Sequence, residues 1–184
     1  MTIQKGNHNI GPQDGKLTVK VYKDGMAAKM GHDLVLEATK WSGNVTVDPE
    51  NPSASSVQVT IDARSLEIIE ATGGAKPLGD KDRKDIAKNI DEKILQTSSH
   101  PDITFDSTDV SGDAPRISLK GCLTLVVKSV PVTLDLTVND NGQVSGRFTI
   151  VQSQFGIKPF SAMMGALKVK DAVNVEFDVT LPTA

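Results

Sequence analysis

The sequence has little of several features that would indicate disulfides, aromatic packing or membrane spans. Its 184 residues include one cysteine, Cys122, so an internal disulfide is excluded. Aromatic residues make up only 4%, so a core has to be built mainly from Val, Leu and Ile. No apolar run approaches the ~20 residues that a membrane-spanning helix needs, so an integral membrane protein is not expected.

Charge of one sign is also not concentrated anywhere along the chain. The formal net charge is −3, and the lysines and arginines are scattered. A nucleic-acid partner would call for a basic stripe, and an anionic membrane for a polybasic cluster, and the sequence contains neither. The first residues include no apolar segment of secretory length, so a cytoplasmic location is expected unless a leader has been removed.

Catalytic and metal-binding patterns are sparse. Three histidines, His8, His32 and His100, are dispersed without metal-ligand spacing, so neither a metal nor another cofactor is expected. His32 precedes Asp33, but adjacent strand residues point to opposite faces, which keeps imidazole and carboxylate apart. No Gly-x-Ser-x-Gly nucleophile motif is present. The chain is therefore not expected to be an enzyme.

What the sequence does contain is a repeated alternation of apolar and polar residues. It runs through 117–127, 132–139 and 173–181, where Val, Leu, Ile or Phe occupies every second position. Such spacing gives a strand one apolar and one polar face. Short polar turns such as Asp140-Asn141-Gly142 join these segments, which predicts antiparallel pairing around a shared apolar side.

Further segments extend this pattern towards the N-terminus. Strands are expected at 16–22, 33–41, 44–47, 56–62, 103–105 and 143–152, with a shorter one at about 154–158. Residues 1–14 are expected to be a flexible terminus with at most a short edge strand, and 15–184 to form one domain. The exception to the alternation is a charged segment in which Ile86, Ile90 and Ile94 recur every four residues. This predicts a short amphipathic helix over about 80–95 that covers one end of the sheet.

The predicted fold class is all-β, an antiparallel up-and-down β-barrel of about eight strands with one short amphipathic helix. A two-sheet sandwich is the alternative. Long strands favour the barrel, because closure removes exposed sheet edges.

Several motifs in the C-terminal half resemble the YceI family. They are His100–Thr108, Leu119–Leu125 and Pro131–Asp135, followed in the family's order by Gly146–Phe148 and Phe155–Ile157. The similarity covers roughly residues 15–182. It implies a bacterial, lipocalin-like extended barrel that holds a polyisoprenoid or another long-chain amphiphile, and some members respond to stress.

Two segments depart from the family's pattern. Met30–Leu34 replaces a His-centred motif, and Asn89–Leu95 lacks the aromatic patch that often ends the family's helix. Fewer aromatic residues near the mouth would alter the length or selectivity of the ligand.

The interior of such a barrel is either a cavity or a filled core. Phe105, Phe148 and Phe177 are the few rings on the apolar faces, which favours unfilled space, and a dry core is the alternative. The candidate lining comprises Leu34, Leu36, Val59, Ile61, Phe105, Leu123, Leu125, Leu134, Leu136, Phe148 and Phe177.

Other candidates lie outside the regular alternation. Phe155, Phe160, Met163 and Met164 would shape a mouth, or else pack as a plain loop on the rim. His32 would hydrogen-bond a polar head group, or else be a satisfied rim residue.

Three functions follow. The first is binding, sequestration or transport of an isoprenoid or acyl lipid. The second is a ligand-free interaction module, which predicts a filled interior and an exposed apolar patch. The third is a lipid-modifying enzyme built on His32, Asp33 and His100. A homodimer is left open.

Overall fold

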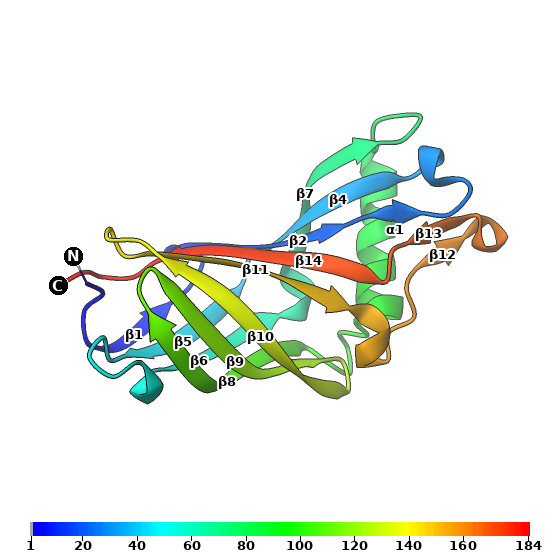
Figure 1. Ribbon diagram of the computed structural model, residues 1–184. Helices are drawn as coiled ribbons and strands as arrows, with labels where there is room; N and C mark the ends of the chain where they lie inside the picture. The colour runs from blue at the N-terminus through cyan, green and yellow to red at the C-terminus, as the bar shows by residue number, and fades with distance from the viewer. Residues whose placement is uncertain (1) are drawn as a thin grey trace.

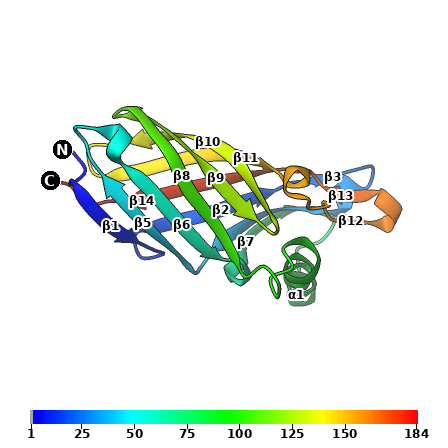
Figure 2. The ribbon, with the colours of Figure 1, turned by 90° about the horizontal axis from the view of Figure 1, so that it is seen from below.

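The computed structural model describes residues 2–184, and its main feature is a long antiparallel sheet that curls around an apolar interior (Figures 1 and 2). Eleven strands form this sheet in the order β1-β5-β6-β8-β9-β10-β11-β14-β2-β4-β7. Their bounds are β1 Gly6–Ile10, β2 Gly15–Val21, β4 His32–Ala38, β5 Trp41–Val47, β6 Ser56–Asp62, β7 Leu66–Gly73, β8 Asp102–Asp113, β9 Arg116–Leu125, β10 Lys128–Val138, β11 Gln143–Val151 and β14 Ala172–Thr180.

A second, small sheet and a helix lie at the end of the molecule opposite the chain termini (Figure 1). The small sheet has the order β12-β13-β3, with bounds Ser161–Ala162, Leu167–Val169 and Lys23–Asp24. The helix α1 spans Asp80–Asn89 and continues into a π-helical turn, η4, over Ile90–Ile94. The sequence-predicted helix over about 80–95 is therefore confirmed.

The curl of the sheet depends on one long bent hairpin. β4 pairs with β7 and β5 pairs with β6, so 32–47 and 56–73 run antiparallel along their whole length. Between the two pairs the chain bends, with Thr39 N donating to Ser65 O and Asp62 N donating to Lys40 O, both at 3.0 Å. Because β5 and β4 lie near opposite ends of the strand order, this bend joins the two sides of the curled sheet.

The barrel prediction holds in part. The fold is all-β with an antiparallel curled sheet, but the number of strands is 14 rather than about eight. The single sheet also excludes the two-sheet sandwich for its eleven strands. β1 and β7 are its two end strands and are not paired with each other among the described residues, so hydrogen bonds do not close the barrel.

Within the segment 1–14, residues 6–10 are an ordered strand at the edge of the sheet. These residues form β1, which pairs with β5 through five residue pairs, and Ile10 is buried. Lys5 Nζ lies 2.9 Å from Asp48 Oδ2 beside this strand. The hydrogen bond from Lys5 holds the pKa of the Asp48 carboxyl below its usual value. The short edge strand that the sequence allowed is therefore present.

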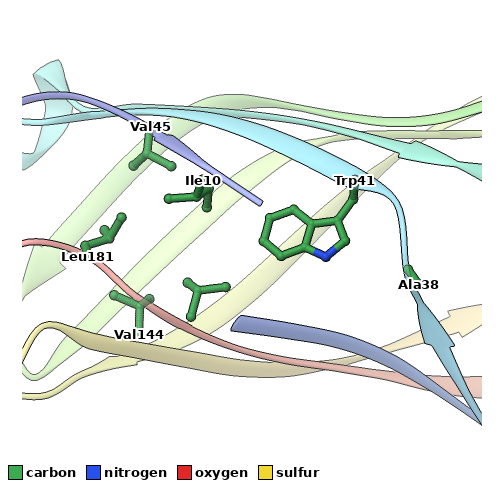
Figure 3. Close-up of a cluster of buried hydrophobic side chains, with 7 residues drawn as sticks. Ile10, Ala38, Trp41, Val45, Val144 and Leu181 are labelled. Carbon is green, nitrogen blue, oxygen red and sulfur yellow. The ribbon is translucent and has the colours of Figure 1, made fainter. Parts of the chain in front are cut away.

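One half of the interior is filled with side chains. A buried cluster near the termini contains Ile10, Ala38, Trp41, Val45, Val144, Val179 and Leu181 (Figure 3). Trp41 is the largest of these residues and is only 7% exposed. Its Nε1 is the one buried side-chain nitrogen or oxygen in residues 2–184 that has no hydrogen-bond partner. The indole is therefore held by packing.

Candidate ligand-binding site

The other half of the interior is hollow. A cavity of about 630 Å³ lies between the curled sheet and the helix. This volume falls within the ~300–1,000 Å³ typical of pockets for small organic ligands. The cavity is where the structure can enclose a molecule.

The sheet wall of the cavity is made of residues on adjacent strands that point inward. Val19 of β2, Val175 of β14 and Phe148 of β11 line it, and they are paired across these strands. The other strand residues on the wall include Val21, Leu34, Leu36, Leu123, Leu125, Ile150 and Val173. Alternation along each strand therefore supplies a continuous aliphatic surface.

The opposite wall is the apolar stripe of the helix. Ile86, Ile90 and Ile94 all line the cavity. In a regular α-helix, positions four apart drift by about 40° around the axis, because each residue advances by about 100°. The π-turn, in which Leu95 N donates to Ile90 O (2.8 Å), is wider and offsets this drift. Three isoleucines spaced four apart can thus face the same cavity.

The cavity ends blind against the filled half. Leu17, Ala38, Ile61 and Leu66 line its inner end and also belong to, or pack against, the buried cluster around Trp41. Trp41 pairs with Ile61 across β5 and β6, so its indole lies directly behind the inner end. The packed cluster therefore sets the depth of the cavity.

Polar groups gather at the outer end. Nine of the 37 lining residues have polar or charged side chains. Seven of the nine lie on β3, on the first residue of β4, on the loop 74–79, on α1 and on β13, namely Lys23, His32, Lys76, Asp82, Asp85, Asn89 and Lys168. The wall is thus apolar inside and polar at the rim, which matches an amphiphile with its chain inward.

His32 ties the loop 74–79 to the sheet. Its Nε2 donates to the carbonyl oxygen of Lys76 at 2.7 Å. Gly74, with φ of +75°, brings the loop backbone so close that a Cβ there would lie 2.4 Å from the imidazole. His32 Nε2 therefore has a hydrogen-bond partner within the protein, and a contact of His32 with a head group stays a prediction.

Half of the sequence-predicted lining lies on the cavity wall. Those residues are His32, Leu34, Leu36, Ile61, Leu123, Leu125, Phe148 and Phe160. Sequence reasoning missed Val19, Val21, Val173 and Val175 although they share the alternation of the residues it chose. It also identified the isoleucine stripe of the helix without assigning it to the lining.

The prediction is wrong for the other eight residues, which do not line the cavity. Val59, Leu134, Leu136 and Phe177 pack in or against buried clusters away from the cavity. The rings of Phe105 and Phe177 lie over Gly121 and Gly146, where an added Cβ would come within 2.5 Å of them. The absence of a side chain at these glycines leaves room for the two rings, and neither ring lines the cavity.

Three of these eight residues, Phe155, Met163 and Met164, were predicted to shape the mouth of the cavity. Phe155 is 1% exposed and belongs to the cluster with Leu95 and Ile157. Met163 and Met164 are instead exposed to solvent at 53% and 107%. None of the three lines the cavity.

The residues of the enzyme hypothesis do not converge. His32 lines the cavity, whereas Asp33 Oδ1 accepts from Lys23 N (2.9 Å) and His100 is not on the wall. Residues 2–184 contain no group of three His, Cys, Asp or Glu side chains placed to hold a metal ion. Nor, over the same span, does any helix have the length and apolar character needed to cross a membrane.

Replacing His32 by Ala is expected to loosen the loop 74–79. Removing one hydrogen bond worth about 0.5–1.5 kcal/mol should speed amide hydrogen exchange in the loop by up to about tenfold. His8→Ala is the matched control, because His8 Nε2 bonds the Gln4 carbonyl at the same 2.7 Å but at the other end. Unchanged exchange at 74–79 in His32→Ala would contradict this role.

The protein belongs to the class of all-β proteins in which a curled antiparallel sheet and one helix enclose an apolar cavity. The profile of the YceI-like domain family matches residues 9–181, and the chain belongs to this family. The similarity seen in the sequence motifs is thereby confirmed.

Two relatives illustrate the sequence similarity. Protein YceI of Escherichia coli O157:H7 is 31% identical over 102 residues, which cover 55% of this chain and 47% of that protein. A UPF0312 protein of Pseudomonas aeruginosa (strain LESB58) is 30% identical over 127 residues, covering 64% and 60%. The chain thus spans about half the length of the relatives that it matches.

Two solved structures share the fold. Burkholderia cenocepacia BcnA superposes with a TM-score of 0.69 at 21% identity, covering 90% of this chain and 94% of that one. A polyisoprenoid binding domain from Saccharophagus degradans, implicated in plant cell wall breakdown, superposes with a TM-score of 0.59 at 11% identity, covering 97% and 100%. At these identities the likeness concerns the fold.

Proposed function

We propose that the chain binds a long-chain amphiphile, a polyisoprenoid or an acyl lipid, and carries or sequesters it with the apolar chain inside the cavity. The observation that supports this most directly is the 630 Å³ cavity with an aliphatic wall and polar groups at its rim. The shared fold with a polyisoprenoid binding domain supports the same class of ligand.

The energetics are sufficient without any special polar contact. Each methylene that leaves water contributes roughly 0.8 kcal/mol, so about 15 enclosed methylenes contribute roughly 12 kcal/mol. With an association cost at the low end of its range, about 4 kcal/mol, roughly 8 kcal/mol remain, which corresponds to micromolar affinity. Rim groups such as Lys23 and Lys168 then lie where a head group would meet water.

The alternatives have less support. A ligand-free module predicts an exposed apolar patch and a filled interior; exposed methionines are present, but the interior contains a cavity of about 630 Å³. Turnover of a lipid would need polar side chains that converge inside the cavity, and His32, Asp33 and His100 do not. We therefore propose binding without catalysis.

Gently purified protein is expected to carry lipid. Native mass spectrometry should show an adduct that disappears after extraction with chloroform and methanol, and the extract should contain a long apolar chain. The delipidated protein should take up a fluorescent fatty acid saturably. A clean protein mass together with no saturable uptake would overturn the proposal.

A further inference from the structure

Four exposed methionines gather at the end of the molecule farthest from the termini. Met26 and Met164 are fully exposed, and Met30 and Met163 are more than half exposed. They are four of the six large apolar residues that the described chain leaves exposed. We call these four residues the methionine tip; it lies on the β3–β4 and β12–β13 connections, at the right-hand end in Figures 1 and 2.

The backbone holds the two connections together. Asp24 of β3 pairs with Lys168 of β13, and Ala27 N donates to Ala166 O at 2.8 Å. Gly25, with φ of +91°, permits this contact, since a Cβ there would lie 2.4 Å from the Ala166 carbonyl oxygen. Methionines about 140 positions apart in the sequence therefore form one surface.

The backbone of the tip holds two of the methionines in an unfavourable conformation. Met163 and Met164 have φ of +52° and +56°, the left-handed region that side chains other than glycine rarely adopt. Met side chains are unbranched and polarizable, so they adapt to irregular apolar surroundings. Here they are exposed to solvent. An apolar surface presented in this way is typical of an interaction site.

The charge around the tip is opposite to that of the whole chain. Segments 22–31 and 157–170 contain five lysines and one aspartate, Asp24, whereas the net charge of the protein is −3. Four of these lysines are exposed, namely Lys29, Lys158, Lys168 and Lys170. The acidic rim residues Asp82 and Asp85 belong to α1, on the helical side of the cavity. Apolar side chains among lysines complement a surface of anionic lipid.

The tip is continuous with the cavity. Met30 lines the cavity together with Leu167, Lys168 and Val169 of β13. Met163 and Met164 lie on the turn that precedes this strand. An apolar chain could pass from a bilayer at the tip to the cavity wall with little exposure to water.

We propose that the methionine tip docks on the surface of an anionic lipid bilayer, with the Met side chains at the boundary of head groups and acyl chains and the lysines at the phosphates. This docking goes beyond ligand binding and does not depend on it, because the tip is outside the cavity apart from Met30. A carrier that docks in this way would exchange its ligand with the membrane directly.

The test is co-sedimentation with vesicles of phosphatidylcholine, with or without phosphatidylglycerol. The protein is expected to bind the anionic vesicles and to dissociate as salt is raised. Met163→Glu with Met164→Glu should lower the partition coefficient tenfold or more, since two apolar contacts are replaced by charges of the wrong sign. Lys29→Glu with Lys158→Glu should weaken binding to anionic vesicles and leave neutral vesicles unaffected, and neither lysine lines the cavity.

Val127→Glu is the matched control, because Val127 is 69% exposed but lies on the β9–β10 turn. Equal loss in this variant, no binding of the unmodified protein, or full binding of the double Met variant would overturn the docking. A dimer in solution that the Met changes dissociate would assign the tip to a second copy instead. Uptake of a fluorescent fatty acid from solution, measured on the same variants, reports the proposed ligand binding separately.

Discussion

Replacing Val175 by Trp is expected to weaken the binding of a long-chain lipid by about 50-fold. Val175 lies on the cavity wall between Val19 and Phe148, so an indole there would occupy space that the chain needs. Displacing about three methylenes at roughly 0.8 kcal/mol each costs about 2.4 kcal/mol. Titration of the delipidated protein with a fluorescent fatty acid measures the change.

The matched control is Thr133→Trp, which adds the same ring on the exposed face of β10. This variant should bind like the unmodified protein. Val175→Trp should retain its unfolding midpoint or gain slightly, because the ring fills empty apolar space. Unchanged affinity in a folded Val175→Trp variant would show that the ligand does not occupy the cavity.

Replacing Trp41 by Ala is expected to lower the free energy of unfolding by about 3–5 kcal/mol. The indole belongs to the buried cluster and lies between Ile10 and Ala38 (Figure 3), so its loss leaves a void among packed side chains. Urea denaturation followed by far-UV circular dichroism measures the effect.

Trp41→Phe separates packing from hydrogen bonding. Nε1 has no partner, so the phenyl ring loses no hydrogen bond and should cost only about 1–2 kcal/mol. A Phe variant as unstable as the Ala variant would mean that the indole nitrogen, rather than the ring, stabilises this region.

Much of the sheet could be predicted from the sequence because the alternation is local. The inward faces of β9, β10, β11 and β14 follow directly from it, and so does the isoleucine stripe of the helix. β1 was not expected as a full strand because its only apolar side chain within Gly6–Ile10 is Ile10.

The division of the interior into a filled and a hollow half could not be predicted. Val173 and Val175 line the cavity while Phe177 and Val179, on the same face of the same strand, pack in the filled half. Alternation specifies the face of a residue, but the position along the strand relative to its neighbours depends on register and curl. The methionine tip could not be predicted either. It depends on the pairing of β3 with β13, and strands of two and three residues are too short to show an alternation in the sequence.

The bent hairpin and the packed Trp41 indole lie behind the inner end of the cavity, so they limit the depth that is available from the rim. If the proposed ligand binds with its apolar chain inward, chain segments longer than this depth would remain outside the cavity, whatever head group they carry. Selectivity would then depend on the length of the apolar chain rather than on the head group, and a smaller residue in place of Trp41 would allow a longer chain to bind.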